Sequence, residues 1–238
     1  MQYPELFKGK LIKRYKRFLA DIILESGEQI TAHVPNSGAM TSCIEENCPV
    51  WVSFHDNPKR KLKYTLELTQ MGESLICTNT GVANKISIEA IHNGVIDELQ
   101  GYGSLKPEQK YGQNSRIDVL LENENENENE KCYVEVKSVS LKIGSTLAFP
   151  DSVTSRGTKH LNELRDMVKE GHRAVMLYII QRTDEAPFRL ADEIDSKYAE
   201  TFEAVTKEGV EVLVYQSSIT HDEINISKKV KMITNKEV

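Results

Sequence analysis

The hydrophobic pattern changes near residue 80, and this change limits the possible folds more than any other feature of the chain. Before it, short apolar runs alternate with turn residues, and no long helical pattern separates them. About five short strands of this kind predict a small closed β barrel. The expected strands are at 18–24, 30–34, 49–54, 64–68 and 74–78.

After residue 80, helical periodicity alternates with apolar strands, which predicts an α/β layer domain with a partly parallel sheet. Helices are expected at 83–99, 152–170 and 191–207, and strands on both sides of residues 122–130, at 173–180 and at 210–215. The run RAVMLYII at 173–180 is uninterrupted, as in a central strand covered on both faces. We therefore expect two domains, 1–80 and 81–238.

The net charge of −6 is unevenly distributed. Residues 1–80 carry ten Lys and Arg against nine Asp and Glu, and the cations gather in KGKLIKRYKRF and DNPKRKLK. A barrel with basic clusters is typical of the oligonucleotide-binding (OB) architecture, although solvated strand faces would look the same. The predicted nucleic-acid contacts of the barrel are Arg14, Lys16, Arg17, Lys59, Arg60 and Lys61.

No apolar run reaches the roughly 18 residues that a membrane helix needs, and the start MQYPELFKGK lacks the apolar stretch of a secretory signal. We therefore expect no membrane partner and a cytoplasmic location. The cysteines form no CxxC pair with a matching partner, so we expect reduced thiols and neither a disulfide framework nor a zinc site. They are Cys43, Cys48, Cys77 and Cys132.

An acidic repeat, ENENENENE at 122–130, separates two apolar segments. Glutamate and asparagine have nothing to bury there, so we expect a mobile, exposed hairpin tip that leaves the chemistry to its flanks. Strand alternation puts Glu135 and Lys137 on one face of the second segment, with Cys132, Val134, Val136 and Ser138 on the other. In the first segment, Asp118 is expected to point opposite to Ile117, Val119 and Leu121.

If the two segments form a hairpin, Asp118 approaches Glu135. Two adjacent carboxylates repel unless a cation bridges them, and hard oxygen ligands suit Mg²⁺ or Mn²⁺. Lys137 would then lie beside the metal, where it could orient a water or hold charge developing on a phosphate. An Asp followed by Glu-x-Lys on the next strand resembles the PD-(D/E)xK nuclease superfamily, although the short motif alone is common.

Further residues support this interpretation. Glu89 on the preceding helix is a candidate third metal ligand, with Glu98 as a possible substitute. Arg156, Lys159 and His160 are expected on one face of the following helix, away from Leu161 and Leu164, where they could meet phosphates. The loop HVPNSGAM at 33–40 is either an anion or ligand contact or a simple turn.

Several longer motifs in order resemble the bacterial and archaeal sugar fermentation stimulation protein A family. They include IKRYKRFLADI, HVPNSGAM, DNPKRK, ICTNTGVAN, SRIDVLL, YVEVKSV and FPDSVTSRGTKHLNEL. The resemblance implies an N-terminal OB-like barrel followed by a nuclease-like α/β domain, largely sequence-independent DNA binding, and a role in regulating sugar, notably maltose, metabolism. The acidic repeat departs from the family pattern.

Three functions stay open at this point. The first is a DNA-binding protein with a metal-dependent phosphodiesterase site at Asp118, Glu135, Lys137 and Glu89. The second is a DNA-binding regulator without catalysis, in which the pocket is a relic or a ligand site. The third is a small-molecule binder that uses HVPNSGAM and the acidic pocket.

Overall fold

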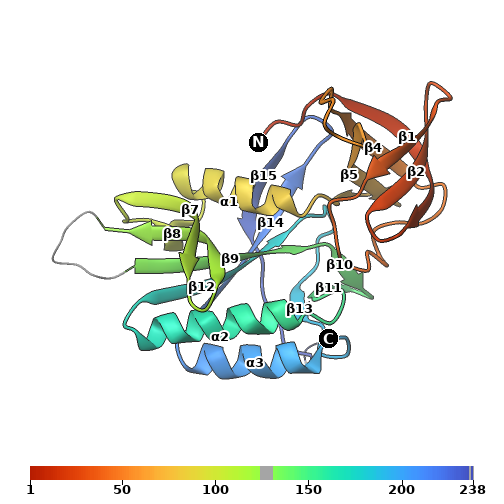
Figure 1. Cartoon of the computed structure of the whole chain (residues 1–238). Helices are drawn as coiled ribbons and strands as arrows, with labels where there is room; N and C mark the ends of the chain where they lie inside the picture. Colours follow the sequence, from red (N-terminus) through yellow and green to blue (C-terminus); the bar gives the residue numbers. More distant parts are fainter. Residues whose placement is uncertain (124–130, 236, 238) are drawn as a thin grey trace.

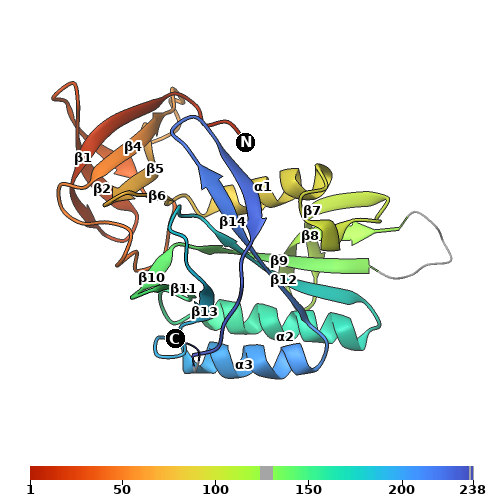
Figure 2. The same ribbon diagram turned by 180° about the vertical axis from the view of Figure 1, so that it is seen from behind.

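The computed structural model describes residues 1–123, 131–235 and 237. A β barrel lies beside a larger domain in which helices cover both faces of a sheet (Figures 1 and 2). The predicted hairpin tip at 124–130 lies outside the described residues. Among the helices of the described residues, none combines the length and the apolar character needed to cross a bilayer.

The barrel closes through five strands. The sheet order is β3-β2-β1-β4-β5-β6, and β3 also pairs in parallel with β5 through Ala32↔Tyr64 and His33↔Thr65. The predicted barrel is therefore confirmed, but the run at 74–78 lies outside the closed ring, and the basic run near the N-terminus supplies the strand that completes it. The strands are β1 Leu6–Tyr15, β2 Leu19–Leu24, β3 Gln29–His33, β4 Pro49–Phe54, β5 Tyr64–Met71 and β6 Ser74–Cys77.

The second domain is built on a mixed sheet in the order β15-β14-β12-β9-β8-β7. Its middle strands β9, β12 and β14 are parallel, and β12 is almost entirely buried, as its apolar run predicts. The strands are β7 Ser104–Tyr111, β8 Ser115–Glu122, β9 Lys131–Val139, β12 Arg173–Ile180, β14 Glu211–Ile219 and β15 Ile224–Lys229. A small sheet of β10 Leu141–Ile143, β11 Thr146–Phe149 and β13 Phe188–Leu190 lies beside it.

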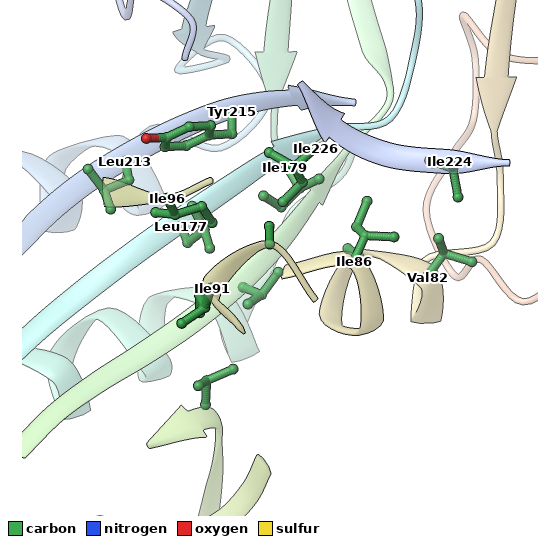
Figure 3. Close-up of a cluster of buried hydrophobic side chains, with 14 of the residues drawn as sticks. Val82, Ile86, Ile91, Ile96, Leu177, Ile179, Leu213, Tyr215, Ile224 and Ile226 are labelled. Atoms are coloured by element: carbon green, nitrogen blue, oxygen red, sulfur yellow. The ribbon is translucent and has the colours of Figure 1, made fainter. Parts of the chain in front are cut away.

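Helices cover both faces of this sheet. Helix α1 (Gly81–His92) packs against one face of the sheet. There Val82, Ile86 and Ile91 join side chains of β12, β14 and β15 in a buried cluster (Figure 3). Helices α2 (Ser155–Lys169) and α3 (Ser196–Lys207) cover the other face (Figure 1). The two faces belong to two separate clusters of buried side chains.

Two predicted helices differ in extent from those observed. The helix expected at 83–99 is interrupted, because Gly94 has a φ of 71° and only a 3₁₀ turn, η1 (Asp97–Leu99), follows. Helix α3 begins at Ser196, five residues later than its expected start, and its N-cap is Asp195, whose carboxylate accepts a hydrogen bond from Tyr198 N at 3.0 Å.

Buried polar contacts join the barrel to the second domain. Arg182 is 2% exposed, pairs with Asp184 at 2.5 Å, and donates from Nη1 to Ser140 O at 2.6 Å and to Ser42 Oγ of the barrel at 3.2 Å. Lys142 also contacts Asp184, at 2.6 Å. The ion pair fixes Arg182 within the second domain, and the hydrogen bond from Arg182 to Ser42 then joins the barrel to it.

Candidate metal and nucleic-acid site

Asp118 lies where β8 and β9 separate. Their ladder extends only as far as Val119↔Val134, and Val136 N on β9 donates to Asp118 Oδ2 at 2.8 Å. The side chain of Asp118 thus provides a β8 acceptor for a β9 amide just beyond the end of the ladder. The expected grouping of Ile117 with Val119 is wrong, since Ile117 packs with the α2 and α3 cluster and Val119 with the α1 cluster.

Glu135 lies opposite Asp118 on β9 and is 2% exposed. Its Oε1 atom accepts from Lys137 Nζ at 2.7 Å and makes a short hydrogen bond with His160 Nδ1. Arg156 Nε donates to His160 Nε2 at 3.3 Å, which leaves the proton of a neutral imidazole on Nδ1, directed at the carboxylate. Glu135 Oε2 is buried without a hydrogen-bond partner among the described residues.

The two carboxylates differ in proton affinity. Burial, followed by the nearby charge of Glu135, raises the pKa of Asp118 to about 6. Burial would also raise the pKa of Glu135, but the charge of Lys137 and the hydrogen bond from His160 lower it below its ordinary value. Glu135 therefore stays ionised to lower pH than an ordinary glutamate, and Asp118 binds a proton at higher pH than an ordinary aspartate.

The predicted outward orientation of His160 is wrong. His160 is 4% exposed and faces Glu135. Leu164, four residues later, lies on the same buried face of α2. Residues four apart lie one above the other on a helix, so the spacing from Leu164 was the signal for an inward His160. Of the other two predicted helix contacts, Arg156 lines the pocket, and Lys159 Nζ binds Gln113 O at 2.9 Å.

Glu89 is not among the residues that line the pocket. Its carboxylate pairs with the Met1 amine at 2.8 Å, so the structure does not support Glu89 as a metal ligand. The carboxylate of Glu98, the possible substitute, accepts hydrogen bonds from Lys229 and Tyr215. The α1 side chain that reaches the site is Asn84, whose Nδ2 donates to Asp118 Oδ1 at 2.7 Å. Sequence reasoning missed Asn84 because a neutral amide, unlike a carboxylate, brings no charge that would attract a cation.

The HVPNSGAM loop forms a wall of the same pocket, which has a volume of about 320 Å³. The pocket is lined by this barrel loop, Asp118 in the middle of β8, the second half of β9, the segment after β11 and the start of α2. At Gly38, a Cβ atom would lie 2.0 Å from Asp151 Oδ2, so a larger residue fits only if the loop or the Asp151 side chain moves. The loop is therefore more than a turn: it brings the barrel to the carboxylates.

Arg14 holds this loop in place. Its guanidinium donates to the carbonyl oxygens of Asn36 at 2.9 Å, Gly38 at 3.0 Å and Ala39 at 3.0 Å. Burial lowers its pKa from the ordinary value. Arg14 was predicted to contact DNA, but its guanidinium N–H groups are hydrogen-bonded to the loop that forms the wall of the pocket.

The other predicted barrel contacts lie outside the pocket. Lys16 and Arg17 occupy the turn between β1 and β2 with φ values of 47° and 66°. Lys59, Arg60 and Lys61 lie in the β4–β5 loop, where Arg60 Nη2 donates to Thr65 Oγ1 at 2.8 Å. These five residues thus lie in two separate loops of the barrel, and neither loop lines the pocket of Asp118 and Glu135.

The donor set of the pocket fits a divalent cation bound partly by water. Asp118 and Glu135 supply carboxylate oxygens, and the unpaired Oε2 of Glu135 is the atom that most needs a positive partner. Within the described part of the chain, no group of three His, Cys, Asp or Glu side chains is arranged to hold a metal. Mg²⁺ commonly retains several waters and uses one or two carboxylates, so two side-chain ligands are sufficient.

Comparison with known families defines the class of the protein. The family model described as "SfsA N-terminal OB domain" matches residues 12–78, and the one described as "Sugar fermentation stimulation protein RE domain" matches residues 81–223. The chain is an OB barrel followed by this mixed α/β domain, which is the predicted fold class. It belongs to the sugar fermentation stimulation protein family.

Named relatives share most of the chain. A "Sugar fermentation stimulation protein homolog" of Geotalea uraniireducens is 48% identical over 233 residues, covering 98% of this chain and 99% of the relative. A homolog of the same name from Marinomonas sp. is 50% identical over 230 residues, covering 96% and 88%. The structure of Pyrococcus furiosus SfsA in complex with Ca²⁺ superimposes with a TM-score of 0.86 at 22% identity and covers 98% of each chain, which supports the shared fold.

Proposed function

We propose that this protein binds DNA largely independently of sequence and that its pocket is a Mg²⁺- or Mn²⁺-dependent phosphodiesterase site. The observation that carries the proposal is the meeting of Asp118, Glu135 and Lys137 in one pocket, with Glu135 Oε2 buried and unpaired. The binding of Ca²⁺ by the Pyrococcus furiosus protein is consistent with a divalent cation in this family.

Each residue has a role that its contacts support. Asp118 and Glu135 would hold the cation through Oδ and Oε2 atoms, while Asn84 and Val136 N orient Asp118. A bound divalent cation supplies Lewis-acid polarisation of a phosphoryl oxygen and lowers the pKa of a coordinated water. Lys137, 15% exposed at its side chain, is placed to hold negative charge that develops beside the carboxylates.

A DNA-binding regulator without turnover is the second candidate. Lys137 and His160 both contact Oε1 of Glu135, so that part of its charge is already balanced within the protein. A role in sugar, notably maltose, metabolism is compatible with either candidate, and its basis is the family resemblance and the names of the relatives.

Metal-dependent cleavage separates the two candidates. The purified protein is incubated with single-stranded, duplex and branched DNA in the presence of Mg²⁺ or Mn²⁺. We expect cleavage that is lost in Asp118→Asn and Lys137→Ala variants and retained in Glu89→Gln, a matched carboxyl-to-amide change outside the pocket. Cleavage that persists unchanged in the first two variants would refute the assignment.

DNA binding is measured separately by fluorescence anisotropy over a range of salt concentrations. Contacts to phosphates release counterions, so the affinity should fall steeply with salt and depend little on sequence. Binding without cleavage by the wild-type protein would favour the regulator, and a salt-insensitive affinity would exclude backbone recognition by either candidate.

A further inference from the structure

An exposed aromatic group lies on the barrel, outside the residues that line the carboxylate pocket. It consists of Phe7 on β1, Phe54 on β4 and Tyr64 on β5, which we name the mouth cluster. The ring centroids of Phe54 and Tyr64 are 5.3 Å apart, and those of Phe7 and Tyr64 are 6.4 Å apart with the planes at 88°. Phe7 is 36% exposed and Phe54 is 42% exposed, so solvent reaches both rings.

Strand alternation explains why these rings gather there. Phe7 shares its strand face with Leu11, and Phe54 shares its face with Val52, and both of these neighbours are buried in the barrel core. Tyr64 packs partly against the same core. The three rings therefore continue the interior of the barrel past its last fully enclosed layer and form an apolar surface at its open end.

A basic loop lies beside this apolar surface. The β4–β5 loop at 55–63 contains four Lys and Arg and one Asp. Lys63 Nζ lies 5.8 Å from the centre of the Phe54 ring and 2.9 Å from Asp56. An apolar patch bordered by excess positive charge suits a partner with flat apolar faces and a negative backbone.

We propose that the mouth cluster is a stacking platform for unpaired bases of single-stranded DNA, with the 55–63 loop contacting its phosphates. This inference rests on the DNA binding of the proposed function and adds a preference for unpaired strands. Stacking on aromatic rings is open to every base because each has a π face, so the platform is compatible with binding that depends little on sequence. Bases inside a duplex are already stacked on one another and cannot use it.

The test compares fluorescein-labelled oligo(dT) with a labelled duplex of equal length in fluorescence anisotropy, with EDTA present to prevent cleavage. The variants are Phe7→Leu and Phe54→Leu, which keep an apolar side chain and remove the ring. Phe18→Leu is the matched control. Phe18 is 44% exposed, lies in the turn between β1 and β2, and is not in the mouth cluster. Circular dichroism confirms that each variant is folded.

We expect each mouth-cluster variant to bind oligo(dT) about tenfold more weakly, to bind the duplex as the wild type does, and to retain the wild-type salt dependence. In contrast, Lys61→Ala should reduce the salt dependence for both DNAs. Equal oligo(dT) affinity of wild type and Phe54→Leu, or an equal loss in Phe18→Leu, would overturn the platform while leaving DNA binding intact. Failure of the wild type to bind either DNA at low salt would overturn the proposed function as well.

Discussion

Replacement of Asp118 by Asn should stabilise the protein at neutral pH, although it removes a proposed catalytic group. Asn has nearly the same shape, can accept from Val136 N, and can pair with Asn84 after that amide turns over. It carries no charge, so the repulsion from Glu135 and the cost of burying a second carboxylate disappear. Functional carboxylates that are held together commonly reduce stability in this way.

The magnitude follows from the pKa of Asp118, which rises from an ordinary 3.8 to about 6. A difference of about two units corresponds to about 3 kcal/mol. Because the folded state binds the proton more tightly than the unfolded state, wild-type stability falls as pH rises from about 4 to about 6 and the loss is complete above that range. The Asn variant should therefore exceed the wild type by about 2–3 kcal/mol at pH 7.5 and by about 0.5 kcal/mol at pH 4.

Urea unfolding at both pH values, with EDTA present, measures this difference. Glu89→Gln serves as the control, since it neutralises a carboxylate that is half-exposed outside the pocket. Addition of Mn²⁺ at pH 7.5 should stabilise the wild type and not the Asn variant, because a ligand stabilises only the folded state that binds it. An Asn variant that is less stable than the wild type at pH 7.5, or a difference that is independent of pH, would refute the reasoning.

Three further changes test the surrounding structure. Gly38→Ala should destabilise the protein by about 1–3 kcal/mol in chemical unfolding, because its Cβ meets the Asp151 carboxylate, and the cost should fall in an Asp151→Ala background; an unchanged cost would contradict the contact. His160→Leu should weaken Mn²⁺ binding, followed by electron paramagnetic resonance, by about 10–100-fold, whereas His160→Asn, which keeps an N–H donor near Nδ1, should bind much more tightly; equal affinities of both would exclude a positioning role. Asp184→Asn should cost about 2 kcal/mol at pH 7, because Arg182 loses its buried partner. The pKa of Asp184 is lowered to about 2, so that difference should shrink as the pH falls from about 4 towards 2, and a constant difference would argue against the ion pair.

Local pattern was sufficient for most elements because strands and helices differ in their period. The uninterrupted run at 173–180 is the buried central strand β12, and the two segments beside the acidic repeat form the hairpin of β8 and β9. Alternation along that hairpin also predicted the approach of Asp118 to Glu135 and Lys137, and the structure brings all three to one pocket. Helix ends were predicted less well where a glycine or a cap, rather than periodicity, sets the limit, as at Gly94 after α1 and Asp195 before α3.

The sequence by itself determined the two kinds of domain, most of their elements, and the carboxylates and lysine that meet where β8 and β9 lie side by side. These depend on period and on pairing between adjacent segments, which are local properties of the chain. Only the tertiary structure decided that His160 turns to Glu135, that Asn84 and not Glu89 reaches Asp118, and that the barrel loop at 36–38 forms a wall of the pocket. Each of these depends on how one layer packs against another, and residues distant in sequence can be judged partners only when that packing is known.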